Sequence, residues 1–179
     1  VSDFLMDRYH AGKNVVPVSV NLSWMDFYDE TIMNWLEKKC ADTSMPSGLY
    51  RMEITETSYA AIEADRSATL EALREAGILL LLDDFGSGYS SFGMLQNYNF
   101  DIMKIDMSFV RQIETNAKTR SIIRFIIEMA HTMDIKIIAE GAETKEQVEF
   151  LRDNGCDYIQ GYYFYRPLPL KEAEMVLTS

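Results

Sequence analysis

Ile78-Leu-Leu-Leu-Leu-Asp-Asp84 is a short apolar run that follows a glycine and ends in two carboxylates. Apolar runs of this length between turn residues are typical of β-strands. Five similar runs, each ending in or near a polar residue, occupy residues 15–21, 49–56, 102–106, 135–140 and 158–164. We therefore predict six strands, and the polar residues at their ends are candidate functional groups.

Helical patterns separate these six runs. Apolar residues at helical spacing predict helices over 27–39, 66–76, 121–133 and 145–153, the second of which ends at Gly77, a favourable C-terminal cap. A strand followed by a helix, repeated along a chain, predicts a parallel sheet with helices outside it. No linker or low-complexity tract interrupts the pattern, so we expect a single domain over residues 1–179.

The spacing of the polar strand ends favours one kind of parallel sheet. Successive ends are 32, 30, 21, 36 and 20 residues apart, at Asn21, Glu53, Asp83, Lys104, Glu140 and Gln160. Such groups meet at one face of a (β/α)8 barrel, whereas an open doubly wound sheet binds ligands mainly at one switch point. We predict an α/β fold, a TIM-like (β/α)8 barrel that is incomplete here, with about six of its eight βα units. Residues 1–9 have the pattern of half a helix, so we expect the first strands to lie upstream.

The polar residues expected at this face are mostly acidic: Asn21, Glu53, Glu56, Asp83, Asp84, Lys104, Glu140, Glu143 and Gln160. Several carboxylates in one place need a cation to stay ionised, and oxygen ligands without His or Cys indicate Mg²⁺ or Mn²⁺. Asp83 and Asp84 can hold two ions together only if the strand ends at Asp83, because successive strand residues point to opposite faces. The alternative for each acid taken alone is a solvated strand end or a helix cap.

Composition excludes several classes of protein. With 17 basic and 28 acidic residues, the net charge of −11 argues against binding of DNA, RNA or an anionic membrane surface. Cys40 and Cys156 lie too far apart in sequence for a zinc cluster or a disulfide scaffold. No apolar run approaches the ~18 residues of a membrane span, and no signal peptide is visible. We therefore expect a cytoplasmic location.

Six motifs together resemble those of the EAL-domain family, bacterial phosphodiesterases that open cyclic di-GMP to linear pGpG. They are Val18-Ser-Val-Asn-Leu-Ser23, Glu53-Ile-Thr-Glu56, Asp83-Asp-Phe-Gly-Ser-Gly-Tyr-Ser-Ser91, Lys104-Ile-Asp106, Ala139-Glu-Gly-Ala-Glu-Thr144 and Gln160-Gly-Tyr-Tyr-Phe164 followed by Pro167-Leu-Pro169. The resemblance covers essentially the whole chain, in order and at the family's spacing. It implies a modified barrel in which one strand is antiparallel, and one or two bound Mg²⁺ or Mn²⁺ ions.

The resemblance also implies roles for individual residues. By this resemblance, the first metal is held by Asn21, Glu53 and Asp83. Asp83 then bridges to a second metal held also by Asp84. Glu140 becomes the general base and Lys104 positions the attacking water, with Gln160 and Glu143 as supports. Glu56 anchors the loop 85–91, which the family uses in metal binding and dimer contacts. No residue is assigned to substrate binding.

The tripeptide Glu-Ala-Leu that names the family is missing from its expected place, on a strand before Val15. The segment Leu70-Glu-Ala-Leu73 lies in a helical pattern, so we interpret its Glu71 as a coincidence. The chain then corresponds to the C-terminal three-quarters of an EAL-type domain whose parent carries sensory or cyclase domains.

Two exposed sheet edges follow from an open barrel. Because such edges are normally covered, we expect a homodimer. The Glu of the missing tripeptide is a metal ligand by the resemblance, so we also expect weak metal binding and slow turnover of cyclic di-GMP. Restoring about 60–80 upstream residues should recover a soluble monomer and activity. The alternatives to an enzyme are an inactive receptor for cyclic di-GMP and a dimerisation module.

Overall fold

The computed structural model describes residues 2–40, 46–55, 58, 67–86, 95 and 99–178. The chain forms two compact units. The first contains Val1–Met52, Ile62–Leu79 and Pro167–Ser179, and the second contains Glu53–Ala61 and Leu80–Arg166. Among the described residues, no helix has the length and the hydropathy needed to cross a membrane.

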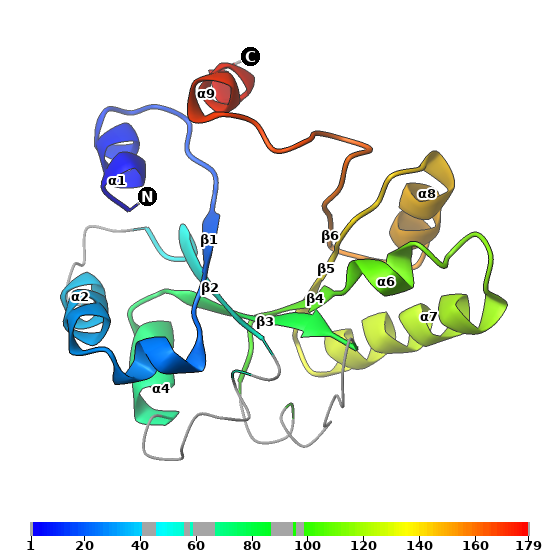
Figure 1. The fold of residues 1–179 in the computed structure, drawn as a ribbon, viewed down its shortest axis with the longest axis horizontal. Helices are drawn as coiled ribbons and strands as arrows, with labels where there is room; N and C mark the ends of the chain where they lie inside the picture. Colours follow the sequence, from blue (N-terminus) through cyan, green and yellow to red (C-terminus); the bar gives the residue numbers. More distant parts are fainter. Residues whose placement is uncertain are drawn as a thin grey trace. The chain divides into compact units, whose positions relative to one another are not determined.

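The described residues contain a six-stranded sheet whose strands follow one another in chain order (Figure 1). The strands are β1 (Val18–Asn21), β2 (Tyr50–Thr55), β3 (Leu79–Phe85), β4 (Ile102–Ile105), β5 (Lys136–Ala139) and β6 (Tyr158–Ile159). Pairing of β3 with β4, β4 with β5 and β5 with β6 is parallel. This order lacks the reversal of an open doubly wound sheet and confirms the predicted α/β fold, an incomplete (β/α)8 barrel with six strands among the described residues.

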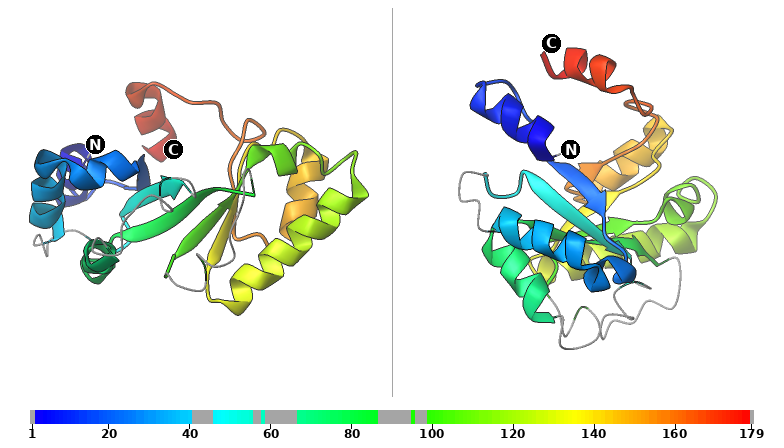
Figure 2. Two further views of the ribbon diagram at one scale, coloured as in Figure 1. Left: turned by 60° about the horizontal axis from the view of Figure 1, so that its bottom comes forward. Right: turned by 60° about the vertical axis from the view of Figure 1, so that its left-hand side comes forward.

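The helices of the second unit cover β4 and β5 (Figure 2). They are α6 (Met107–Val110), α7 (Ala117–Thr132) and α8 (Lys145–Asp153). The side chain of Asn116 caps α7 by accepting hydrogen bonds from two backbone amides of its first turn. Thr144 and Gln147 form a capping box at the start of α8. The predicted range 145–153 therefore matches α8, while α7 begins four residues before the predicted 121 because Asn116 caps it there.

The first unit contains α1 (Ser2–His10), the 3₁₀ helix η1 (Trp24–Tyr28), α2 (Glu30–Cys40), α4 (Ser67–Glu75) and α9 (Leu170–Thr178). The coincidental Glu-Ala-Leu segment lies in α4, as the sequence predicts. Leu70 and Leu73 are buried, whereas Glu71 is exposed and lies 3.4 Å from Arg74 on the same helix. Glu71 is therefore a helix-surface residue.

A buried arginine joins the first and last helices of the first unit. Arg8 Nη1 lies 2.8 Å from Glu174 Oε1, and its Nε and Nη2 donate to the carbonyl oxygen of Asn14. Asn14 Nδ2 in turn donates to the carbonyl oxygen of Leu177 at 3.2 Å. These contacts tie α1 to α9, a helix that the sequence patterns did not predict.

The last strand is shorter than the predicted 158–164. It ends at Ile159 because the chain then turns around Ala142: the Ala142 amide donates to Gln160 O, and Ala142 O accepts from the Tyr163 amide. A side chain at Gly161 would overlap the backbone of Ala142. The turn leaves the aromatic residues that follow exposed: Tyr162, Tyr163, Phe164 and Tyr165.

Candidate functional site

A lysine in β4 connects three carboxylates from neighbouring strand ends of the second unit. Lys104 Nζ lies 2.7 Å from Glu53 Oε2 of β2 and 2.9 Å from Asp83 Oδ1 of β3. It also lies 2.7 Å from Oε1 of Glu140, the residue that follows β5. The sequence predicted that these four side chains share the carboxyl edge of the sheet, and the structure brings them together there.

Burial makes the electrostatics of this cluster strong, because the Lys104 side chain is only 5% exposed. Burial lowers the pKa of Lys104, but hydrogen bonds to Glu140, Glu53 and Asp83 outweigh burial and raise the pKa above its ordinary value. The lysine is therefore charged at neutral pH. Burial also raises the pKa of Glu140, and the hydrogen bond from Lys104 opposes that rise.

Asp83 and Asp84 both reach the cluster although β3 continues to Phe85, so the expectation that the strand must end at Asp83 was wrong. Leu82 pairs with Met103 and Phe85 with Ile105, so two β3 residues stand opposite Lys104 alone, which is a β-bulge. Asp84 has φ +56°, a conformation that Asp tolerates better than most residues. Its amide donates to Asp83 Oδ1 at 3.0 Å. The bulge, and not the end of the strand, turns both carboxylates to one side.

Asp83, Asp84 and Glu140 form a compact set of oxygen donors. One carboxylate oxygen of each lies within 4.8 Å of the others. Hard divalent cations prefer oxygen ligands, usually from carboxylates. The donor set therefore fits Mg²⁺ or Mn²⁺ and offers none of the nitrogen or sulfur atoms that zinc prefers.

Asp106 is a contributor to the site that the sequence motifs contained but to which no role was given. Burial, then Asp83 and then Asp106 raise the pKa of Asp84. Asp106 also caps α6 by accepting a hydrogen bond from the Ser108 amide at 2.9 Å. Its position directly after β4 was the signal that could have identified it.

The remaining predicted residues are less closely connected to the cluster. Asn21 is the exposed last residue of β1, in the first unit. Glu56 lies outside the described residues. Glu143 Oε1 lies 3.8 Å from Arg111 Nη2, and the backbone of Gln160 bonds to Ala139 and Ala142. Their assigned roles stay predictions.

Gly141 fixes the backbone directly after Glu140. The Glu140 amide donates to the carbonyl oxygen of Ile105 at 3.1 Å, which extends the β4–β5 pairing by one residue. Gly141 has φ +73°, and a Cβ atom there would lie 2.7 Å from Cβ of Met107. Only glycine fits this left-handed conformation without displacing α6.

Gly141→Ala is expected to lower the free energy of unfolding by about 2–4 kcal/mol. The loss has two causes, the strain of a left-handed backbone at alanine and the overlap of its Cβ atom with Met107. Urea denaturation measures this loss. Gly12→Ala is the matched control, since Gly12 has φ +67° but no atom within 4 Å of its Cβ position. The control should lose only about 1 kcal/mol. Equal losses would show that Met107 moves aside without cost.

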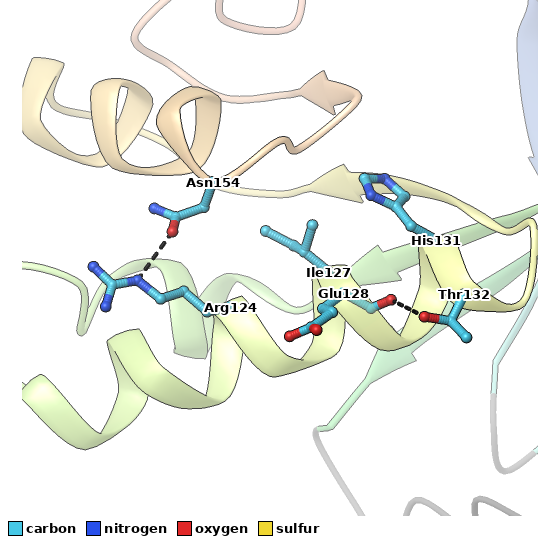
Figure 3. Close-up of a pocket in the computed structure, with 6 residues that line it drawn as sticks. All are labelled: Arg124, Ile127, Glu128, His131, Thr132 and Asn154. Carbon is cyan, nitrogen blue, oxygen red and sulfur yellow. Dashed lines mark hydrogen bonds between the residues drawn. The ribbon is translucent and has the colours of Figure 1, made fainter.

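A hollow lies along the second half of α7, beside the end of α8 (Figure 3). Four of its polar side chains have hydrogen-bond partners. Arg124 Nε donates to Asn154 Oδ1 at 2.9 Å, and Thr132 Oγ1 donates to the Glu128 carbonyl oxygen. His131 Nε2 lies 2.9 Å from Asp157 Oδ2. The carboxylate cluster at Lys104, with its buried charges and its carboxylate oxygens close together, is the candidate site.

Comparison with known proteins places these features in context. The EAL domain family profile matches residues 2–167. Cyclic di-GMP phosphodiesterase NbdA of Pseudomonas aeruginosa is 35% identical over 175 residues, which is 98% of this chain and 22% of NbdA. The chain thus spans about a fifth of the length of NbdA and of two other curated relatives that it matches.

Solved structures are similar over most of the chain. The EAL enzyme Bd1971, in its form with cAMP and cyclic di-GMP bound, has a TM-score of 0.83 at 31% identity, covering 91% of this chain and 43% of that one. The manganese and cyclic di-GMP complex of Klebsiella pneumoniae BlrP1 has a TM-score of 0.78 at 29% identity, covering 91% of this chain and 41% of that one.

Proposed function

We propose, because the chain belongs to the EAL domain family, that it is a metal-dependent phosphodiesterase that hydrolyses cyclic di-GMP to linear pGpG in bacterial second-messenger signalling. The observation that carries this proposal is the buried cluster in which Lys104 contacts Glu53, Asp83 and Glu140, with Asp84 beside them. A relative named a cyclic di-GMP phosphodiesterase and a similar structure holding manganese with cyclic di-GMP support it.

The proposed metal ligands are Asn21, Glu53, Asp83 and Asp84, which would hold one or two Mg²⁺ or Mn²⁺ ions. Such ions, when bound, supply an activated water and stabilise charge on the phosphate. Glu53 and Asp83 are supported in this role by their place at Lys104, and Asp84 by its carboxylate oxygen near those of Asp83 and Glu140. A site with this many carboxylates needs cations before it can accept an anionic dinucleotide.

Glu140 is the proposed general base. Its carboxylate would accept the proton of the attacking water at the oxygen that does not contact Lys104. Because burial raises the pKa of Glu140, the group is a better proton acceptor than a solvated glutamate. Lys104 would hold Glu140 in position and place positive charge beside the reacting phosphate. Glu56, Glu143 and Gln160 remain proposed supports of these groups.

The test is to incubate the purified chain with cyclic di-GMP and Mn²⁺, with an excess of EDTA as the control. Products are separated by liquid chromatography with mass detection, which also records slow turnover, and binding is measured by calorimetry. We expect conversion to pGpG with Mn²⁺ and none with EDTA. Binding without conversion would identify a receptor, and neither binding nor conversion would leave a dimerisation module.

The expected homodimer, the cytoplasmic location and the fusion to sensory or cyclase domains are further proposals. The short span of this chain relative to NbdA agrees with fusion to other domains in such proteins. Light scattering on the purified chain measures the oligomeric state, and a monomer would contradict the predicted dimer.

A further inference from the structure

Lys104 supplies to the cluster a positive charge of the kind that a bound cation would supply. Its ammonium contacts carboxylate oxygens from three separate segments of the sheet at 2.7–2.9 Å. The carboxylates of Glu53, Asp83 and Glu140 are themselves only 15%, 13% and 19% exposed. Water therefore screens their mutual repulsion poorly, and the lysine is the closest positive charge that the described residues provide for it.

The charges at this point do not balance without a further cation. Glu53, Asp83 and Glu140 carry three negative charges when ionised, and Lys104 carries one positive charge. The four groups together therefore have a net charge of −2. Asp84 adds another negative charge beside Asp83 and Glu140. Lys104 thus compensates enough charge for the carboxylates to be buried together, while the net negative charge that remains favours a divalent cation.

We propose that Lys104 is a built-in counter-ion, which holds Glu53, Asp83 and Glu140 together before any metal binds and which weakens metal binding by its own positive charge. The inference rests on the proposed metal site, and it assigns to Lys104 a part in metal affinity that is separate from its proposed part in hydrolysis. Each carboxylate contacts Lys104 through one oxygen, so its second oxygen stays available for a metal.

Two measurable consequences follow from this arrangement. Removing the ammonium leaves three buried carboxylates without compensation, which is costly in the metal-free protein. The same removal takes a positive charge away from the metal, so a divalent cation binds more tightly. Metal-free stability and metal affinity should therefore change in opposite directions.

The experiment compares wild type with Lys104→Met, which keeps an unbranched side chain that is one atom shorter and removes its charge. In EDTA, the melting temperature of Lys104→Met should fall by about 10 °C. Calorimetric titration with MnCl₂ alone should then show an affinity at least about tenfold higher than that of wild type. The increase in melting temperature on adding Mn²⁺ should accordingly be larger for the variant.

Lys145→Met is the matched control, since Lys145 is an exposed lysine that contacts one carboxylate, Glu149 Oε1, at 3.4 Å. It should change the melting temperature by less than about 2 °C. Equal melting temperatures of wild type and Lys104→Met in EDTA would overturn the proposal, and so would an unchanged or weaker affinity of that variant for Mn²⁺.

A second variant covers the case in which Lys104→Met does not fold in EDTA. Adding Glu53→Gln removes one uncompensated charge, so the double variant should be more stable than Lys104→Met alone. Failure of both Glu53→Gln and Mn²⁺ to restore folding would overturn the proposal, because packing would then explain the loss.

The EDTA measurements require neither metal nor nucleotide. They therefore test the counter-ion separately from the proposed phosphodiesterase activity. One possible outcome is that wild type binds no Mn²⁺ while Glu53→Gln restores the stability of Lys104→Met. This result would refute the metal site and support the charge compensation by Lys104. The opposite outcome is that wild type hydrolyses cyclic di-GMP while Lys104→Met is as stable as wild type in EDTA. This result would support the phosphodiesterase activity and refute the charge compensation.

Discussion

Glu140→Gln is expected to lower the turnover of cyclic di-GMP by about 10²–10⁴-fold while leaving its binding nearly unchanged. Glutamine has the same shape as glutamate, and its amide oxygen can still accept the hydrogen bond that Lys104 Nζ donates to Oε1. The amide cannot take a proton from water, so the loss should fall on the chemical step. Turnover is measured by product mass and affinity by calorimetry.

The control for this variant is Glu146→Gln, at an exposed position in the first turn of α8. It should retain wild-type turnover, since Glu146 contacts only Arg120 at 3.6 Å among the ion pairs of the described residues. If Glu140→Gln also keeps full turnover, Glu140 is not the base. A parallel loss of affinity would instead make Glu140 a binding residue.

Asp83→Asn is expected to cost more activity than Asp84→Asn. Asp83 contacts Lys104 at 2.9 Å and is the only residue proposed to touch both ions, whereas Asp84 would hold one. Mutation of a residue that only supports a metal ligand typically costs about 10–100-fold in metal affinity or activity, so we expect a loss of at least this size for Asp84→Asn, a proposed ligand, and a larger one for Asp83→Asn. Activity is measured across a range of Mn²⁺ concentrations.

Excess Mn²⁺ distinguishes the two positions further. Asp84→Asn should recover most of its activity at high Mn²⁺, because mass action can offset weaker binding at one ion. Asp83→Asn should recover little, since its loss affects both ions. Equal losses that Mn²⁺ does not rescue would contradict the assignment of Asp83 as the bridge.

Local patterns in the sequence were sufficient to predict much of this fold. The run that ends in Asp83 and Asp84 predicted a strand, and the spacing to Lys104 and Glu140 predicted that their side chains share one edge of the sheet. Both follow from periodicity and from the parallel βα repeat. The apolar spacing over 145–153 predicted α8 with the correct bounds, and in the structure a capping box between Thr144 and Gln147 fixes its first turn.

Features that depend on partners distant in sequence could not be predicted in this way. The bulge at Asp83 and Asp84 is set by their register against β4, and no local pattern encodes it. Arg8 and Glu174 are 166 residues apart, so neither one identifies the other. The short β6 results from the turn of the chain around Ala142, where Gly161 has no room for a side chain.

Water is proposed to attack cyclic di-GMP at this carboxylate cluster, and oxygen labelling follows that attack in the product. The chain is incubated with cyclic di-GMP and Mn²⁺ in water enriched in ¹⁸O, and the mass of the product is recorded. Hydrolysis consumes one water for each phosphodiester bond opened, so the expected product is pGpG with a single heavy oxygen in its terminal phosphate, and Glu140→Gln should form almost no product. Folded protein that binds Mn²⁺ and cyclic di-GMP but forms no labelled pGpG would contradict it.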